Sequence, residues 1–134
     1  MPELPEVETV CRGLAPVLEG AILRNIIVRQ PKLRFPVPPR FSDALAGQKI
    51  LTIRRRAKYI LLEMEKGDVV IGHLGMSGRM TIYQTPHEAP VPGRHDHIDF
   101  ETAAGPIVRF ADPRKFGLML LTDQESLEDH KLIR

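Results

Sequence analysis

The chain has 134 residues, of which 43% are hydrophobic and 27% charged, a size and composition typical of one globular domain. No run approaches the roughly 20 apolar residues of a membrane-spanning helix, and the acidic, proline-punctuated opening is unlike a signal peptide. Cys11 is the single cysteine, which excludes an internal disulfide and a cysteine-based zinc site and is typical of a reducing cytosol.

Residues 5–19 predict an amphipathic helix. Pro5 suits the first helical position, where no backbone N–H is needed. The buried face would be formed by the apolar residues with helical spacing, which are Val7, Val10, Cys11, Leu14, Val17 and Leu18. Pro16 predicts a kink or a break near residue 15, and Gly20 suits a left-handed cap beyond the end of the helix.

Short runs rich in Ile, Val, Leu and Tyr follow, separated by Gly, Pro and Asp. They predict strands at 22–29, 49–55, 59–65, 68–74, 79–84, 97–101, 106–111 and 117–122. Residues 41–47 predict a short helix with Ser42 as its cap, and the proline-rich segment 86–94 predicts a loop. We therefore expect a mainly β fold, a sandwich or pseudobarrel of about eight strands, with an N-terminal helix and other helices outside it.

Basic residues are concentrated in one part of the chain. The formal net charge is only +2, but ten basic residues lie between residues 24 and 58, where Asp43 is the single acid. This basic stripe, residues 24–58, favours a polyanion over a neutral small molecule as the partner. The alternative is a solvated charged face without a specific partner.

The opening sequence MPELPEVET places Pro2 where removal of Met1 would leave a secondary amine at the chain terminus. An α-amine has an ordinary pKa of about 7.7–8.0, against about 10.4 for lysine, so more of it is uncharged and able to attack a carbonyl carbon. The resulting iminium would withdraw electrons, and Glu3 would be adjacent to donate or accept a proton. The alternative is that this segment only begins the helix.

The segment RRRAKY (54–59) places four cations at the end of a strand. Lys58 is expected at the strand edge or in a turn, and alternation gives Arg55 a different face from Arg54 and Arg56. Such a cluster suits phosphate contacts, with one amine reaching a reaction centre. It also suits a charged edge strand that prevents aggregation.

Two glycine-containing turns carry residues that could enter DNA. In HLGMSGRM (73–80), Met76 lies at the tip of a turn, either as a single exposed apolar residue or as a wedge. In RFADPRKFG (109–117), Asp112 and Pro113 predict a turn, after which Arg114 and Phe116 project to the same side. That pair could enter a vacated base position in a DNA-binding protein; elsewhere it would be a cation and a core ring.

Five segments together resemble the formamidopyrimidine-DNA glycosylase family. MPELPEVET, RRAKY, HLGMSG, HDHIDF (95–100) and DPRKFG occur in the order and approximate spacing of that family's N-terminal domain. The family includes endonuclease-VIII-like glycosylases, and the segment PELPEVET favours the formamidopyrimidine branch. The resemblance covers residues 1–134 and implies that the helix–two-turn–helix region and the four-cysteine zinc finger, with its one zinc ion, lie outside this chain.

The resemblance implies base-excision repair, in which oxidised purines (8-oxoguanine and formamidopyrimidines) are removed from damaged double-stranded DNA and the strand is nicked by β- and δ-elimination. It assigns catalysis to Pro2 as the nucleophile at C1′, Glu3 as the proton donor and Lys58 as the proton carrier in elimination. Met76, Arg114 and Phe116 would fill the gap left by the flipped base. Further DNA contacts would come from Arg114 again, His73 and His95.

The same resemblance implies no cofactor in this domain, no membrane partner, and a monomeric full-length protein in the bacterial cytoplasm, associated with the nucleoid. The isolated domain would bind DNA weakly and show little or no excision.

His95, His97 and Asp99 alternate along one expected strand and invite comparison with a metal site. Alternation is usual for strands, however, and the family uses no metal there.

Two rival functions remain at this point. One is a tautomerase that uses Pro2 as a general base on a small keto acid, chemistry that requires neither the basic stripe nor a Phe116 wedge. The other is a non-catalytic nucleic-acid or protein interaction module, whose binding would not depend on the state of the terminal amine.

Overall fold

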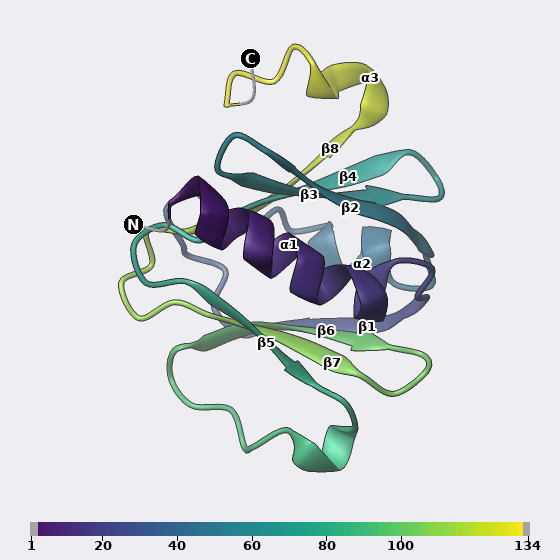
Figure 1. The fold of residues 1–134 in the computed structure, drawn as a ribbon, viewed down its shortest axis with the longest axis vertical. Coiled ribbons are helices and arrows are strands. Elements are labelled where there is room, and N and C mark those ends of the chain that lie inside the picture. The colour runs from purple at the N-terminus through teal and green to yellow at the C-terminus, as the bar shows by residue number, and fades with distance from the viewer. Residues whose placement is uncertain (1–2, 133–134) are drawn as a thin grey trace.

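Eight strands and three α-helices make up most of the computed structural model, which describes residues 3–132 (Figure 1). In chain order the elements are α1 (Leu4–Leu18), β1 (Leu23–Val28), α2 (Phe41–Leu45), β2 (Ile50–Arg56), β3 (Tyr59–Met64), β4 (Asp68–His73), β5 (Arg79–Tyr83), the 3-10 helix η1 (Pro86–Glu88), β6 (Asp96–Thr102), β7 (Ile107–Ala111), β8 (Leu118–Asp123) and α3 (Gln124–Leu127). The strands form two antiparallel sheets, ordered β1-β6-β7-β5 and β2-β3-β4-β8. The predicted mainly β sandwich is confirmed.

Helices α1 and α2 lie at the two open sides of the sandwich, α1 in front and α2 behind in the view of Figure 1. The face of α1 predicted from its spacing is the buried one, with Val7, Cys11, Leu14 and Leu18 inside. These side chains share one core with Phe41 of α2 and Phe100 of β6. The rings of Phe41 and Phe100 pack edge to face, with their centroids 6.2 Å apart. The long N-terminal helix is thus held by both sheets.

The structure differs from two local predictions at helix ends. Pro16 does not break α1, which continues to Leu18, because a proline in the last turn removes only one hydrogen bond near the end of the helix; the kink stays a prediction. Ser42 is not the cap of α2, which begins at Phe41 and makes no side-chain capping bond. The Phe41 N–H donates to the carbonyl of Pro38, so the preceding turn leads straight into the helix. Gly20 does take the predicted left-handed conformation, with φ +81°.

Strands β3 and β4 are buried on both faces, which explains their near-continuous apolar sequences YILLEM and DVVIGH. The outer face is covered by a second apolar cluster, Leu61, Val69, Ile71, Leu118 and Leu127. Phe35 packs against this cluster from the loop after β1. This contact holds the loop containing Arg34 across the sheet and close to the end of β4.

Cys11 and the segment 86–94 lie outside the two sheets. Cys11 is buried, and burial raises the pKa of its thiol to about 11, so the thiol stays protonated and serves packing rather than nucleophilic chemistry. The segment 86–94 is a loop as predicted, apart from the single turn η1.

No helix within residues 3–132 is long and apolar enough to cross a bilayer.

Candidate active site

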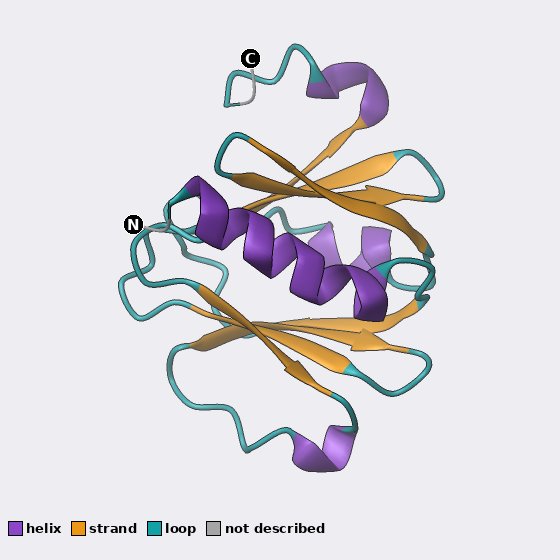
Figure 2. Ribbon diagram, viewed as in Figure 1, coloured by secondary structure: helices purple, strands orange, loops and turns teal. Residues whose placement is uncertain are grey.

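Strand register brings several turns to one edge of the molecule. The residue pairs at this edge are Arg56–Tyr59, Ile60–Gly72, His73–Leu118 and Arg79–Ala111. The β2–β3 turn, the β4–β5 loop and the β7–β8 loop are therefore neighbours, and they lie on the same side of Figure 2 as the first turn of α1. The edge thus collects the segments in which Glu3, Lys58, Met76, Arg114 and Phe116 occur.

Arg55 joins the start of α1 to the turn that carries Lys58. Its Nε lies 3.0 Å from Glu8 Oε1, and its Nη1 donates to the carbonyl of Ala57 at 2.9 Å. Ala57 has φ +51°, an uncommon conformation for a non-glycine residue, and this sharp turn places the half-buried Lys58 just beyond the end of β2. Glu3 is the cap residue of α1, and its exposed side chain makes no capping hydrogen bond. Its carboxyl is therefore not engaged by the helix it precedes.

His73, the last residue of β4, lies at this edge and is only 7% exposed. Its Nδ1 accepts a hydrogen bond from the Gly75 N–H at 2.9 Å, and its ring packs edge to face on Tyr59. Burial lowers the pKa of His73, and the positive charges of Arg34 and Lys58 lower it further. The imidazole is therefore neutral at pH 7, with Nδ1 as the acceptor and Nε2 carrying the proton.

An open pocket of about 410 Å³ lies above His73 and is lined by Arg34, His73, Gly75, Met76 and Phe116. Met76 is 49% exposed and Phe116 45% exposed, so two large apolar side chains project from neighbouring loops. The guanidinium of Arg114 lies 5.4 Å from the centre of the Phe116 ring, which confirms that these two residues project to one side. A cationic pocket with an apolar rim suits a phosphate beside an unstacked base.

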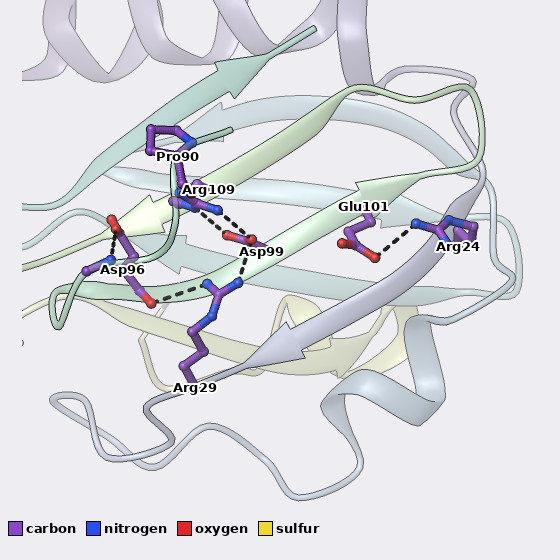
Figure 3. Close-up of polar contacts among 8 residues, drawn as sticks. Arg24, Arg29, Pro90, Asp96, Asp99, Glu101 and Arg109 are labelled. Atoms are coloured by element: carbon purple, nitrogen blue, oxygen red, sulfur yellow. Dashed lines mark hydrogen bonds and ion pairs between the residues drawn. The ribbon is translucent and has the colours of Figure 1, made fainter. Parts of the chain in front are cut away.

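His95 stands next to this edge, whereas His97 and Asp99 are buried. The Asp112 N–H donates to the His95 carbonyl at 3.0 Å, which places His95 beside the β7–β8 loop. His97 Nε2 donates to the carbonyl of Asp112 at 2.7 Å. Asp99 accepts hydrogen bonds from Arg29 and Arg109 (Figure 3). The two buried residues are thus engaged by different protein partners, and the three do not form a common ligand set.

The basic stripe is not the continuous cationic surface that its composition suggests. Five of its ten basic residues form ion pairs, which are Arg24–Glu101, Arg29–Asp99, Arg54–Glu63, Arg55–Glu8 and Arg56–Glu128. Arg55 turns to α1 while its two neighbours contact other carboxylates, as strand alternation predicted. All five acidic partners come from outside residues 24–58, so the count of charges within the stripe did not reveal them.

Comparison with known proteins identifies the family. The model of the formamidopyrimidine-DNA glycosylase N-terminal domain matches residues 1–119. The chain belongs to this family. The formamidopyrimidine-DNA glycosylase of Ruegeria pomeroyi is 46% identical over 138 aligned positions, which cover 99% of this chain and 49% of that protein. The one from Rhodospirillum rubrum is 51% identical and is covered to 47% of its length. The chain thus spans about half the length of the curated relatives it matches.

Solved structures of the formamidopyrimidine-DNA glycosylase family share the fold. The Lactococcus lactis enzyme, bound non-covalently to DNA containing an abasic site, superposes with a TM-score of 0.87 at 32% identity, over 98% of this chain and 49% of that one. The same enzyme with DNA containing Fapy-dG superposes with a TM-score of 0.85 at 33% identity, over 97% of this chain and 48% of that one. The resemblance inferred from five motifs is confirmed at the level of family and fold.

Within this family fold, the edge gathers most of the residues singled out in the sequence. Lys58, His73, Met76 and Phe116 meet around the pocket or beside it, whereas Pro2 lies outside the described residues. Sequence reasoning missed Arg34, whose N–H donates to the Gly117 carbonyl at 3.2 Å and whose side chain lines the pocket. Its only sequence signal was membership of the basic stripe, which does not distinguish it from the paired arginines.

Proposed function

We propose that this chain is the N-terminal catalytic half of a base-excision repair enzyme, a formamidopyrimidine-DNA glycosylase with AP lyase activity. Its substrate would be damaged double-stranded DNA carrying an oxidised purine such as 8-oxoguanine or a formamidopyrimidine. One observation carries the proposal: a neutral buried histidine, the cation Arg34 and two exposed apolar side chains line one open pocket, and the positive charge of Lys58 is close enough to lower the pKa of that histidine. Membership of the family supports the assignment of this edge to DNA.

In this proposal the nucleophile is the secondary amine of Pro2, exposed by removal of Met1. Its nitrogen lone pair attacks C1′ of the damaged nucleotide, the bond from C1′ to the base breaks, and the base leaves with a proton. Glu3 donates a proton to the sugar ring oxygen, and the ring opens to give the iminium. The positive end of the 15-residue helix α1 lies at this terminus and attracts the DNA backbone.

Strand scission follows from the electron-withdrawing iminium. It acidifies the hydrogens on C2′, so loss of one proton expels the 3′ phosphate by β-elimination, and a second elimination expels the 5′ phosphate. Lys58 is the proposed proton carrier in these steps, held near α1 by the contact of Arg55 with Glu8. Arg34 and the Nε2 proton of His73, which line the pocket, would contact a phosphate.

The damaged base must leave the stack before this chemistry can begin. Flipping costs a few kcal/mol, least at a damaged or mismatched pair, and side chains that enter the gap recover part of that cost. We assign this wedge role to Met76, Arg114 and Phe116, and a supporting DNA contact to His95 next to the β7–β8 loop.

The remaining half of the enzyme would supply the rest of the DNA grip. We propose that a helix–two-turn–helix region and a zinc finger follow this domain in a longer, monomeric protein, which acts on nucleoid DNA in the bacterial cytoplasm. The zinc ion would be held there, because the single cysteine of this chain is buried in its core.

Borohydride trapping tests the proposal directly. The longer protein, with Met1 removed, is incubated with an 8-oxoguanine duplex and borohydride, which reduces the imine to a stable covalent adduct. We expect Pro2→Gly to lose most of the adduct, and the matched control Pro5→Ala, in the same opening segment, to retain it. Full trapping by Pro2→Gly would refute the assignment. Turnover of a small enol substrate without any DNA adduct would favour the tautomerase instead.

A further inference from the structure

A buried carboxylate joins the two loops that carry the proposed wedge residues. Asp112 is 0% exposed, and its Oδ1 accepts a hydrogen bond from the Ser77 hydroxyl at 2.7 Å. Its Oδ2 accepts from the Gly117 N–H at 2.8 Å. The Ser77 hydroxyl in turn accepts from the Arg114 N–H at 3.1 Å. The residues engaged are Arg114 itself and the direct neighbours of Met76 and Phe116.

The main chains of the two loops also touch. A Cβ added to Gly75, which has φ +61°, would lie 2.6 Å from the Gly117 nitrogen and 2.6 Å from the Phe116 carbonyl carbon. One added to Gly117 would lie 2.6 Å from the His73 oxygen and 2.8 Å from Asp112 Oδ2. Both glycines therefore permit a close backbone approach that no side chain would allow. The loops have no space to move past each other independently.

Asp112 also ties this pair of loops to the sheet. Its N–H donates to the His95 carbonyl and its carbonyl accepts from His97 Nε2, so the main chain is anchored on both sides to the start of β6. Within residues 3–132, no ion pair involves its carboxylate. A buried carboxylate without a cation is costly. Each of its two oxygens, however, accepts a hydrogen bond, from the Ser77 hydroxyl and from the Gly117 N–H. An asparagine would present an NH₂ group, which cannot accept, to one of these two donors.

We infer that Asp112, acting through Ser77, is a positioning residue that makes the Met76 loop and the Arg114–Phe116 loop one rigid wedge. The inference rests on the proposed function, in which these three side chains enter the stack. Stacked bases resist entry, so an apolar tip on a loosely held loop would be pushed aside. The buried carboxylate of Asp112 links the two loops, and the main chain of Asp112 is hydrogen-bonded to the start of β6. The sheet therefore holds the loops in place when their tips enter the stack.

Ser77→Ala tests the inference in the longer protein. We measure single-turnover excision of 8-oxoguanine from a full duplex and from a duplex in which the lesion lies in a short unpaired bubble. We expect at least about tenfold slower excision on the duplex, because the substitution removes both the hydrogen bond to the Asp112 carboxylate and the acceptor of the Arg114 N–H, and less than about twofold on the bubble. Ser77→Thr keeps the hydroxyl and should restore the duplex rate. Ser126→Ala, in α3 away from the loops, is the matched control.

Equal slowing on both substrates, or none on the duplex, would overturn the inference. Amide exchange provides a readout that does not need activity. In Ser77→Ala the Gly117 N–H keeps its own acceptor, yet we expect it to exchange about tenfold faster because the loops separate, with Ile71 in β4 unchanged. Unchanged Gly117 exchange would overturn the inference even if excision were detected. Lack of excision by the unsubstituted protein, with the exchange effect present, would instead count against the proposed function.

Discussion

Replacing Asp99 by Asn should destabilise the fold more than any change to a surface ion pair. The Asp99 carboxylate is 2% exposed and accepts hydrogen bonds from Arg109 at 2.8 and 3.1 Å and from Arg29 at 2.7 Å (Figure 3). Arg109, at 4% exposed, would then be a buried charge facing a neutral amide. Removing one partner of a buried pair costs about 3–5 kcal/mol.

The lower end of that range is the better expectation here. Arg109 would keep its hydrogen bond to the Pro90 carbonyl at 2.8 Å and its position over the Tyr83 ring. A loss of about 3 kcal/mol is a large part of the 5–15 kcal/mol that holds a typical domain together. In a domain of this size it corresponds to a fall in Tm of about 10 °C.

Urea unfolding followed by far-UV circular dichroism measures the effect, since the chain has no tryptophan for fluorescence. The matched control is Glu101→Gln on the same strand, β6, which breaks the ion pair with Arg24 of β1. Arg24 is 63% exposed, so we expect a loss of less than about 1 kcal/mol. If Asp99→Asn cost no more than Glu101→Gln, the reasoning from burial would be refuted.

The pH dependence of stability gives an independent check on Asp99. Burial by itself would raise its pKa, but hydrogen bonds from Arg29 and Arg109 outweigh burial and hold the pKa below its ordinary value. A pKa lowered by folding contributes stability that is complete above the unfolded value of about 3.9 and is lost as pH falls through the folded pKa. The unsubstituted protein should therefore lose stability below about pH 4 more steeply than Asp99→Asn.

Three further predictions concern stability. Burial would raise the pKa of Glu63, but three side-chain hydrogen bonds lower it to about 2; acid titration should show stability lost between about pH 4.5 and 2 in the unsubstituted protein and a flatter profile in Glu63→Gln. Phe100→Ala should cost about 3–5 kcal/mol in urea unfolding, because the ring is fully buried in the core between the sheets. Gly75→Ala should cost more than Gly20→Ala, for which about 1–2 kcal/mol is expected: both have positive φ, but only at Gly75 would the new Cβ strike backbone. Equal losses for the two glycine variants would contradict the close contact of the loops.

Local patterns predicted the elements because the information they need is local. Apolar spacing in residues 5–19 identifies the buried face of α1, and the runs after residue 22 identify eight strands. The predicted break at Pro16 and the predicted cap at Ser42 were wrong, because the outcome depended on the distance to the helix end and on a preceding turn. The motifs supplied the family and the residue types of the site, but not their spatial arrangement.

Tertiary structure decided which charges are available and what holds the site together. Arg55 and Arg34 belong to one basic stripe, yet Arg55 contacts Glu8, 47 residues away, while Arg34 lines the pocket. Ser77 and Asp112 are 35 residues apart and meet only because β4, β5, β7 and β8 end at one edge. Ion pairs and hydrogen bonds act over a few ångströms, so the partners of a polar side chain follow from how the strands pair and not from the order of the chain.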